Sequence, residues 1–86
     1  MPGAVRKNVD TAGGKLVSGS EDVFINNEGA VRIGDKVASH GKKAHKSSEM
    51  AEGSETVFVN NKKLSRAGHK AKCGHPATGS SDVSVE

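Results

Sequence analysis

The sequence repeats itself at an offset of 34 residues, and this repeat restricts the fold more than any other feature. Residues 20–27 (SEDVFINN) return as residues 54–61 (SETVFVNN), and the match continues as far as Gly34 and Gly68. A third copy begins at residues 79–85 (GSSDVSV), close to the end of the sequence. An internal repeat should be sought early in a sequence, because it sets the architecture.

Each copy is typical of a β-hairpin. The triplets at residues 23–25 and 57–59 are β-branched or aromatic, as strands prefer, and their consecutive apolar residues indicate strands covered on both faces. The Asn-Asn pair that follows each triplet tolerates positive φ and suits a tight reversal. Return strands are therefore predicted at residues 30–33 and 64–67.

The third copy lacks a return strand of its own, and the start of the chain offers one. Residues 4–6 (AVR) match residues 30–32 (AVR), and Asp10 takes the place of Asp35 after a one-residue insertion. We therefore expect the first and last segments to pair. The prediction is three similar units around a pseudo-threefold axis, with the two termini side by side.

Three long segments rich in Gly, Ser, Lys and His connect the units, at residues 10–18, 35–53 and 69–79. No stretch shows helical periodicity over ten or more residues, and residues 47–52 suit one helical turn at most. The predicted fold is all-β: a small cone of three β-hairpins with long loops converging on an apex. With 86 residues, a single domain over residues 1–86 is expected.

The composition leaves such a cone short of stabilising contacts. Phe24 and Phe58 are the only aromatic residues, and only 33% of the residues are hydrophobic. Small scaffolds of this kind depend on disulfides, a metal or a partner. Because Cys73 is the only cysteine, an intramolecular disulfide is excluded, which leaves a metal or partner contacts.

Four potential metal ligands lie in two of the long loops. His40 and His45 have the spacing H-x4-H, and Cys73 and His75 the spacing C-x-H. Two separate clusters of nitrogen and sulfur ligands are typical of a closed tetrahedral zinc site. In an extended segment, residues i and i+2 point to the same face, so Cys73 and His75 could share one ion. The alternative is two solvated histidines and a small buried thiol.

His69 is a fifth candidate ligand. It lies 34 residues after Asp35, so we expect it at a structural turn and leave it outside the set of four. Cys73 as a nucleophile would need an orienting third group, and none is evident.

Other function classes find little support. The sequence contains neither a Walker A loop nor G-x-G-x-x-G, and its two phenylalanines, placed inside strands, offer no stacking platform for single-stranded nucleic acid. The first ten residues have no apolar core of a signal peptide, and no apolar run could span a bilayer. Synthesis in the cytoplasm is expected.

The repeat and the ligands together resemble the PAAR-repeat proteins, which tip the spike of contractile injection machines. The resemblance rests on residues 19–26 and 32–35 with their second copies, and on residues 73–80 (CGHPATGS). Residues 29–32 (GAVR) and 63–66 (KLSR) stand in place of Pro-Ala-Ala-Arg. The family implies one structural zinc ion near the apex, held by three histidines and one cysteine. His40, His45, Cys73 and His75 match that set, and His69, where the pattern has Asp, is an alternative ligand.

The resemblance implies a structural protein, not an enzyme. As a monomer, the cone would cap a trimeric β-helical spike, VgrG-like or its phage equivalent, and sharpen it for piercing an outer membrane. Its place would be the virion tail tip or a type VI secretion apparatus. The competing hypothesis is a free-standing zinc-stabilised module that binds anionic polymers through its lysines. A metallohydrolase is a third reading, which closed coordination opposes.

Overall fold

The structure, a computed structural model, describes residues 2–39 and 48–85. Within these ranges the chain forms short antiparallel strands, turns and bends. These residues contain no helix, and hence none long enough to cross a membrane. The prediction of an all-β fold is confirmed. Four two-stranded sheets are formed, by β1 (Thr11–Ala12) with β2 (Gly14–Lys15), β3 (Phe24–Ile25) with β4 (Glu28–Gly29), β5 (Lys36–Val37) with β6 (Ser48–Glu49), and β7 (Phe58–Val59) with β8 (Lys62–Lys63).

Three equivalent segments, residues 4–6, 30–32 and 64–66, form a triangle at the centre of the molecule. Single bridges join them in pairs: Arg6 with Ala30, Arg32 with Leu64, and Arg66 with Ala4. Backbone hydrogen bonds close the ring, from the N–H of Val31 to the carbonyl of Val5 (3.0 Å), from Ser65 to Val31 (2.9 Å), and from Val5 to Ser65 (3.2 Å). The pseudo-threefold arrangement predicted from the repeat is thus built into the backbone.

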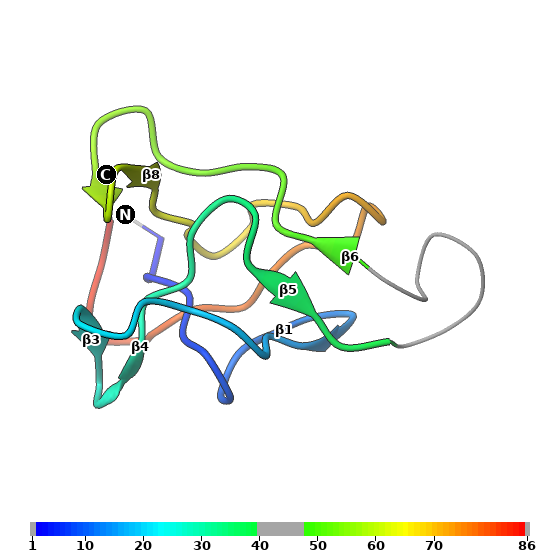
Figure 1. Cartoon of the computed structure of the whole chain (residues 1–86), viewed down its shortest axis with the longest axis horizontal. Helices are drawn as coiled ribbons and strands as arrows, with labels where there is room; N and C mark the ends of the chain where they lie inside the picture. The colour runs from blue at the N-terminus through cyan, green and yellow to red at the C-terminus, as the bar shows by residue number, and fades with distance from the viewer. Residues whose placement is uncertain (1, 40–47, 86) are drawn as a thin grey trace.

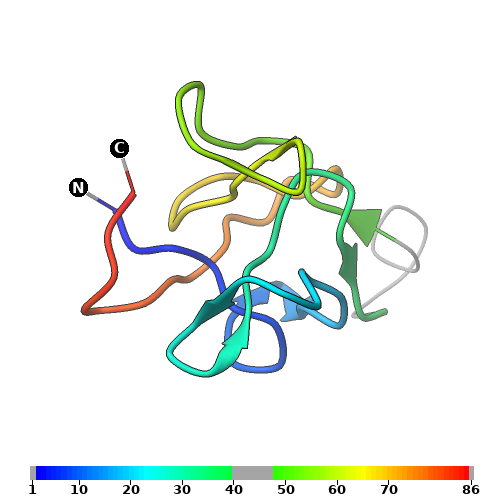
Figure 2. The same ribbon diagram turned by 60° about the vertical axis from the view of Figure 1, so that its left-hand side comes forward.

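The two ends of the chain complete the third unit, as predicted. Gly3 pairs with Ser84, and the N–H of Val85 donates to the carbonyl of Pro2 at 2.7 Å. The termini lie side by side in both views (Figures 1 and 2). The serine that opens each unit accepts the N–H groups of the residues two and three positions further on, at Ser20, Ser54 and Ser80.

The hairpins turn at the predicted asparagines. Asn26 and Asn27 have φ values of 53° and 69°, and Asn60 and Asn61 have 53° and 65°. Positive φ at both central residues defines a type I′ turn, whose twist suits a tight hairpin. The strands that return directly from these turns are β4 and β8, so hairpin pairing begins earlier than the predicted return strands at residues 30–33 and 64–67, whose residues instead form the bridges of the triangle.

We call the end that carries β3–β4, β7–β8 and both termini the base, and the three segments at the other end the arms (Figure 1). Arm 1 is residues 10–17 and contains β1 and β2; arm 2 is the described residues 35–39 and 48–51 and contains β5 and β6; arm 3 is residues 69–78. Bridges join Leu16 to Val37 and Met50 to Ala71, and the N–H of Thr78 donates to the carbonyl of Thr11 at 2.9 Å. The arms therefore form a second, looser ring.

Two small cores lie on either side of the triangle, one towards each end. The core on the arm side consists of Val5, Ala12, Leu16, Val31, Val37, Met50, Ala71 and Ala77, with Cys73 packed against it. The core on the base side consists of Ala4, Ala30, Val59, Leu64 and Val85. Since the triangle supplies residues to both cores, base and arms are parts of one packed structure.

One expectation about local structure was wrong. Phe24 and Phe58 are 59% and 55% exposed, so these strands are not covered on both faces. β3 and β7 belong to two-stranded hairpins at the margin of the molecule, and the phenylalanine side of each hairpin faces solvent. The described residues 48–52 form no helical turn, which is within the limit of one turn expected for residues 47–52, because Ser48 and Glu49 pair with β5 instead.

Candidate metal centre and its supports

Cys73 and His75 are brought together by a tight turn near the end of arm 3. The N–H of Gly74 donates to the carbonyl of Ala71 at 2.9 Å, and the N–H of Ala71 donates to the carbonyl of His75 at 3.0 Å. Gly74 has a φ of 96°, which a residue with a side chain rarely adopts. The segment is therefore a turn, not the extended stretch expected from the C-x-H spacing.

The turn places the two side chains at a separation that suits a shared metal ion. The Sγ of Cys73 lies 3.6 Å from the Nδ1 of His75. Two tetrahedral ligands with Zn–S near 2.3 Å and Zn–N near 2.0–2.1 Å stand roughly 3.5–3.6 Å apart. Both side chains are partly buried, which limits competition from water. This pair thus fits half of a tetrahedral zinc site.

The other two predicted ligands, His40 and His45, lie outside the described residues. The strands that flank them, β5 and β6, pair with each other, with Val37 opposite Ser48. Ser48 also contacts the Cys73 turn, because its Oγ accepts the N–H of Cys73 at 3.1 Å. The described ends of the segment that carries His40 and His45 therefore lie beside Cys73. Within residues 2–39 and 48–85, no three His, Cys, Asp or Glu side chains cluster closely enough to hold a metal.

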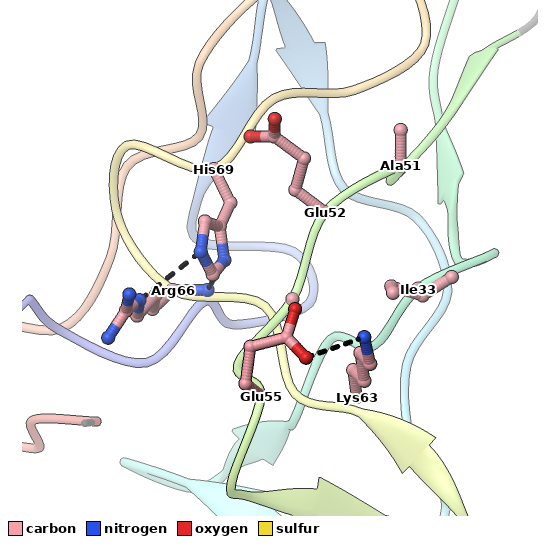
Figure 3. A pocket seen from close by; sticks show the side chains of 8 residues that line it. Ile33, Ala51, Glu52, Glu55, Lys63, Arg66 and His69 are labelled. Carbon is pink, nitrogen blue, oxygen red and sulfur yellow. Dashed lines mark hydrogen bonds and ion pairs between the residues drawn. The ribbon is translucent and has the colours of Figure 1, made fainter.

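His69 faces an arginine in the described structure. The N–H and the Nε of Arg66 lie 3.2 Å from its Nδ1 and its Nε2, respectively (Figure 3). Both ring nitrogens therefore face Arg66, at the foot of arm 3. This placement agrees with the structural turn expected from the repeat.

Asp10 and Asp35 occupy the corresponding places at the feet of arms 1 and 2. Asp35 accepts three hydrogen bonds from Arg32, from the backbone N–H at 2.7 Å, Nε at 2.9 Å and Nη2 at 3.0 Å. Asp10 accepts the same three from Arg6, at 2.8, 2.8 and 3.0 Å. We call Arg6–Asp10, Arg32–Asp35 and Arg66–His69 the three clamps, since each fixes the start of an arm to the central triangle.

The pKa shifts follow from these contacts. The hydrogen bond to Asp10 raises the pKa of Arg6, and the hydrogen bond to Asp35 does the same for Arg32. Burial opposes the charged form of Asp10, but hydrogen bonds from Arg6 and Thr78 outweigh it and lower the pKa of Asp10. Burial, and then the charge of Arg66, lower the pKa of His69. The first two clamps are thus ion pairs, whereas the third favours a neutral ring.

Sequence reasoning missed the clamps and the exposed phenylalanines. A signal for the clamps was present, because Arg32 and Asp35 recur three residues apart as Arg66 and His69. The arginines also reach into the base: the Nη1 of Arg32 donates to the Oδ1 of Asn60 at 2.9 Å, and the Nδ2 of Asn60 donates to the Oδ1 of Asp22 at 3.0 Å. Hydrogen bonds from Asn60 and then Ser20 lower the pKa of Asp22.

Comparison with protein families gives a decisive match. The PAAR motif covers residues 7–84 of the 86-residue sequence. The chain belongs to the PAAR motif family. No curated protein matches the sequence. PAAR membership supports, in general terms, a structural role associated with a spike tip, a spike protein as partner, and metal binding.

Proposed function

We propose that this PAAR protein caps the end of a trimeric β-helical spike, VgrG-like or from a phage tail, and sharpens it for piercing the target cell envelope. The observation that carries the proposal is the pseudo-threefold base with its exposed phenylalanines. One chain offers three similarly built edges there, so a monomer can meet three identical subunits at once. The proposed location is the virion tail tip or a type VI apparatus.

The base has the properties of a docking face. Phe24 and Phe58 are equivalent residues of two units and are exposed in both. Exposed aromatic side chains are costly to leave in water and are common as anchors in protein interfaces. Strands at the margin of a sheet can also extend a partner's strands through their free edge. Ser84 occupies the equivalent place in the third unit, so two anchors out of three are aromatic.

The arms would form the point, stiffened by one structural zinc ion. We propose that His40, His45, Cys73 and His75 hold this ion, and the 3.6 Å separation of Cys73 Sγ and His75 Nδ1 supports the assignment. In the part of the chain that the structure describes, arms 2 and 3 have no helix and few buried side chains to fix their ends. A metal bound between them would replace the packing that such short strands lack.

Binding to a purified spike trimer, such as the one encoded nearest to this gene, tests the proposal. Phe24→Ser and Phe58→Ser should each weaken binding by about tenfold, and the double variant by about a hundredfold, because each loses a desolvated aromatic anchor. Biolayer interferometry gives these affinities. Val17→Ser is the matched control: Val17 is 43% exposed but lies on arm 1, so binding should not change.

Two results would contradict the proposal in different ways. If Phe24→Ser and Val17→Ser weakened binding to the spike trimer equally, the docking face would not lie on the base. No binding to any spike trimer, together with salt-sensitive binding to DNA or lipopolysaccharide, would favour the free-standing module for anionic polymers.

A further inference from the structure

The third clamp differs from the other two in its chemistry. In the first and second clamps a carboxylate accepts three N–H groups of an arginine within 3.0 Å. In the third clamp an imidazole faces two N–H groups of Arg66, each at 3.2 Å. Within residues 2–39 and 48–85, Arg66 forms no ion pair with a carboxylate.

An imidazole is poorly matched to these two donors. A neutral ring has one acceptor nitrogen, because the other carries a proton. It can therefore accept from the backbone N–H or from Nε of Arg66, but not from both at once. A protonated ring accepts from neither and places a positive charge beside the guanidinium. The clamp is consequently closed only while His69 is neutral, and even then it is half satisfied.

The surrounding charges do not remove this dependence. Glu52 and Glu55 reach the same groove from the preceding segment, as does Lys63 from β8 (Figure 3). Glu55 pairs with Lys63 at 3.0 Å, and the Oε1 of Glu52 accepts the backbone N–H of Lys70 at 2.7 Å. Burial lowers the pKa of His69, followed by the charge of Arg66, and the opposing influence of Glu52 is smaller. The groove, about 390 Å³ in volume, gives water access to the ring.

The third clamp fixes the arm that carries Cys73 and His75. The carbonyl of His69 accepts the N–H of Ala77 at 2.8 Å, and Lys70 bridges to Pro76. The N–H of Gly68 donates to the carbonyl of Ala77 at 2.9 Å. His69 thus stands at the open end of the hairpin-like arm 3. Opening of the clamp would leave the start of the arm attached by the backbone hydrogen bond from the N–H of His69 to the carbonyl of Arg66 at 3.0 Å, and so loosen it.

We propose that Arg66–His69 is a pH-responsive clamp that loosens arm 3 in mild acid, while the two aspartate clamps keep arms 1 and 2 attached. The direction of the pH effect follows from the linkage between proton binding and folding. A histidine with a lowered pKa in the folded state adds stability that is fully present above its ordinary pKa of 6.5 and is lost as the pH falls towards the folded pKa. The pKa of Asp10 is lowered from 3.8, so its clamp persists to far lower pH.

The test exchanges residues between two clamps. The pH dependence of unfolding by urea is measured from pH 7.5 to 5.0 for the wild type, His69→Asp and His69→Asn, with the metal present as isolated. The equilibrium constant for unfolding should rise several-fold more for the wild type than for either variant as the pH falls. Because His40, His45 and His75 remain in every variant, their titration cancels in this difference. Asp35→His should introduce the same dependence into the second clamp.

Two measurements on the folded protein keep the test independent of variant stability. The ring of His69, followed by NMR in the wild type, should titrate below 6.5. Amide exchange at Arg66 and Ala77, compared with His69→Asp at each pH, should accelerate in mild acid while exchange at Val31 does not. Parallel stability curves for wild type and His69→Asp, or a His69 that titrates at or above 6.5, would overturn the proposal. Neither outcome depends on binding to a spike.

Discussion

The base and the arms of this molecule differ in how closely the three units follow one another. In the base, the opening serine of every unit donates its N–H to the same carbonyl position at 2.8 Å, for Ser20 to Ala30, Ser54 to Leu64 and Ser80 to Ala4. The arms differ in length, in pairing and in composition, and only arms 2 and 3 carry candidate metal ligands. The three units thus remain alike in the base, whereas the arms have diverged from one another.

Gly3→Ala should be the most destabilising of the substitutions considered, and it acts on the base. A Cβ on Gly3 would overlap the carbonyl oxygen of Ser80, which belongs to the backbone of the opposite terminus. The side chain cannot be accommodated without separating the two ends of the chain. We expect a loss of about 4 kcal/mol or more in the free energy of unfolding, measured by urea denaturation.

Gly68→Ala is the matched control for this change. Nothing lies within 4 Å of a Cβ at Gly68, but its φ of 92° is unfavourable for alanine. Backbone strain alone should cost about 1 kcal/mol. If both alanine variants were equally stable, the pairing of the termini would contribute little, and the triangle alone would have to hold the third unit.

The base was also the part that the sequence could predict. Its turns depend on Asn26 and Asn60, which tolerate positive φ locally, and the closure of the third unit follows from the match of residues 4–6 to residues 30–32. The exposure of Phe24 could not be predicted in this way. Two aromatic residues in a chain poor in apolar residues favour burial, and the proposed docking face would account for their exposure.

The arms were harder to predict for a different reason. Strands of two residues, such as β1 and β5, show no periodicity, so propensity cannot distinguish them from loop. The Cys73 turn was mistaken for an extended segment, because the C-x-H spacing is compatible with both. The zinc assignment itself remains a prediction, since His40 and His45 lie outside the described residues.

Cys73→Ala should destabilise the arms and leave the base folded. If zinc is bound as proposed, the purified wild type contains about one equivalent by elemental analysis and the variant contains much less. The loss of one ligand should lower the free energy of unfolding by about 3 kcal/mol, or the midpoint of thermal unfolding by more than 10 °C. Amide protection should fall at Ala71 and Met50 and persist at Val31.

If the protein binds no metal, Cys73→Ala should have a smaller effect. Cys73 would then act only as a small partly buried side chain, and Cys73→Ala would cost about 1 kcal/mol with no change in metal content. Exhaustive chelation of the wild type gives a second reading that needs no substitution. Unchanged heat resistance after chelation would refute the metal centre, and the arms would have to be stabilised by the ring of bridges alone.

The smallest effects should come from the clamps, where base and arms meet. Asp35→Ala leaves Arg32 without its carboxylate, and both side chains are largely buried, with 13% and 7% exposed. We expect a cost of about 2 kcal/mol at pH 7, less than for a fully buried pair because solvent still reaches the guanidinium. His69→Ala removes one neutral hydrogen bond and should cost about 1 kcal/mol or less. Urea denaturation of the two variants side by side measures the difference. If both variants lost the same free energy of unfolding, the histidine clamp would stabilise the fold as much as the aspartate clamp. The threefold equivalence of the base would then extend to the feet of the arms.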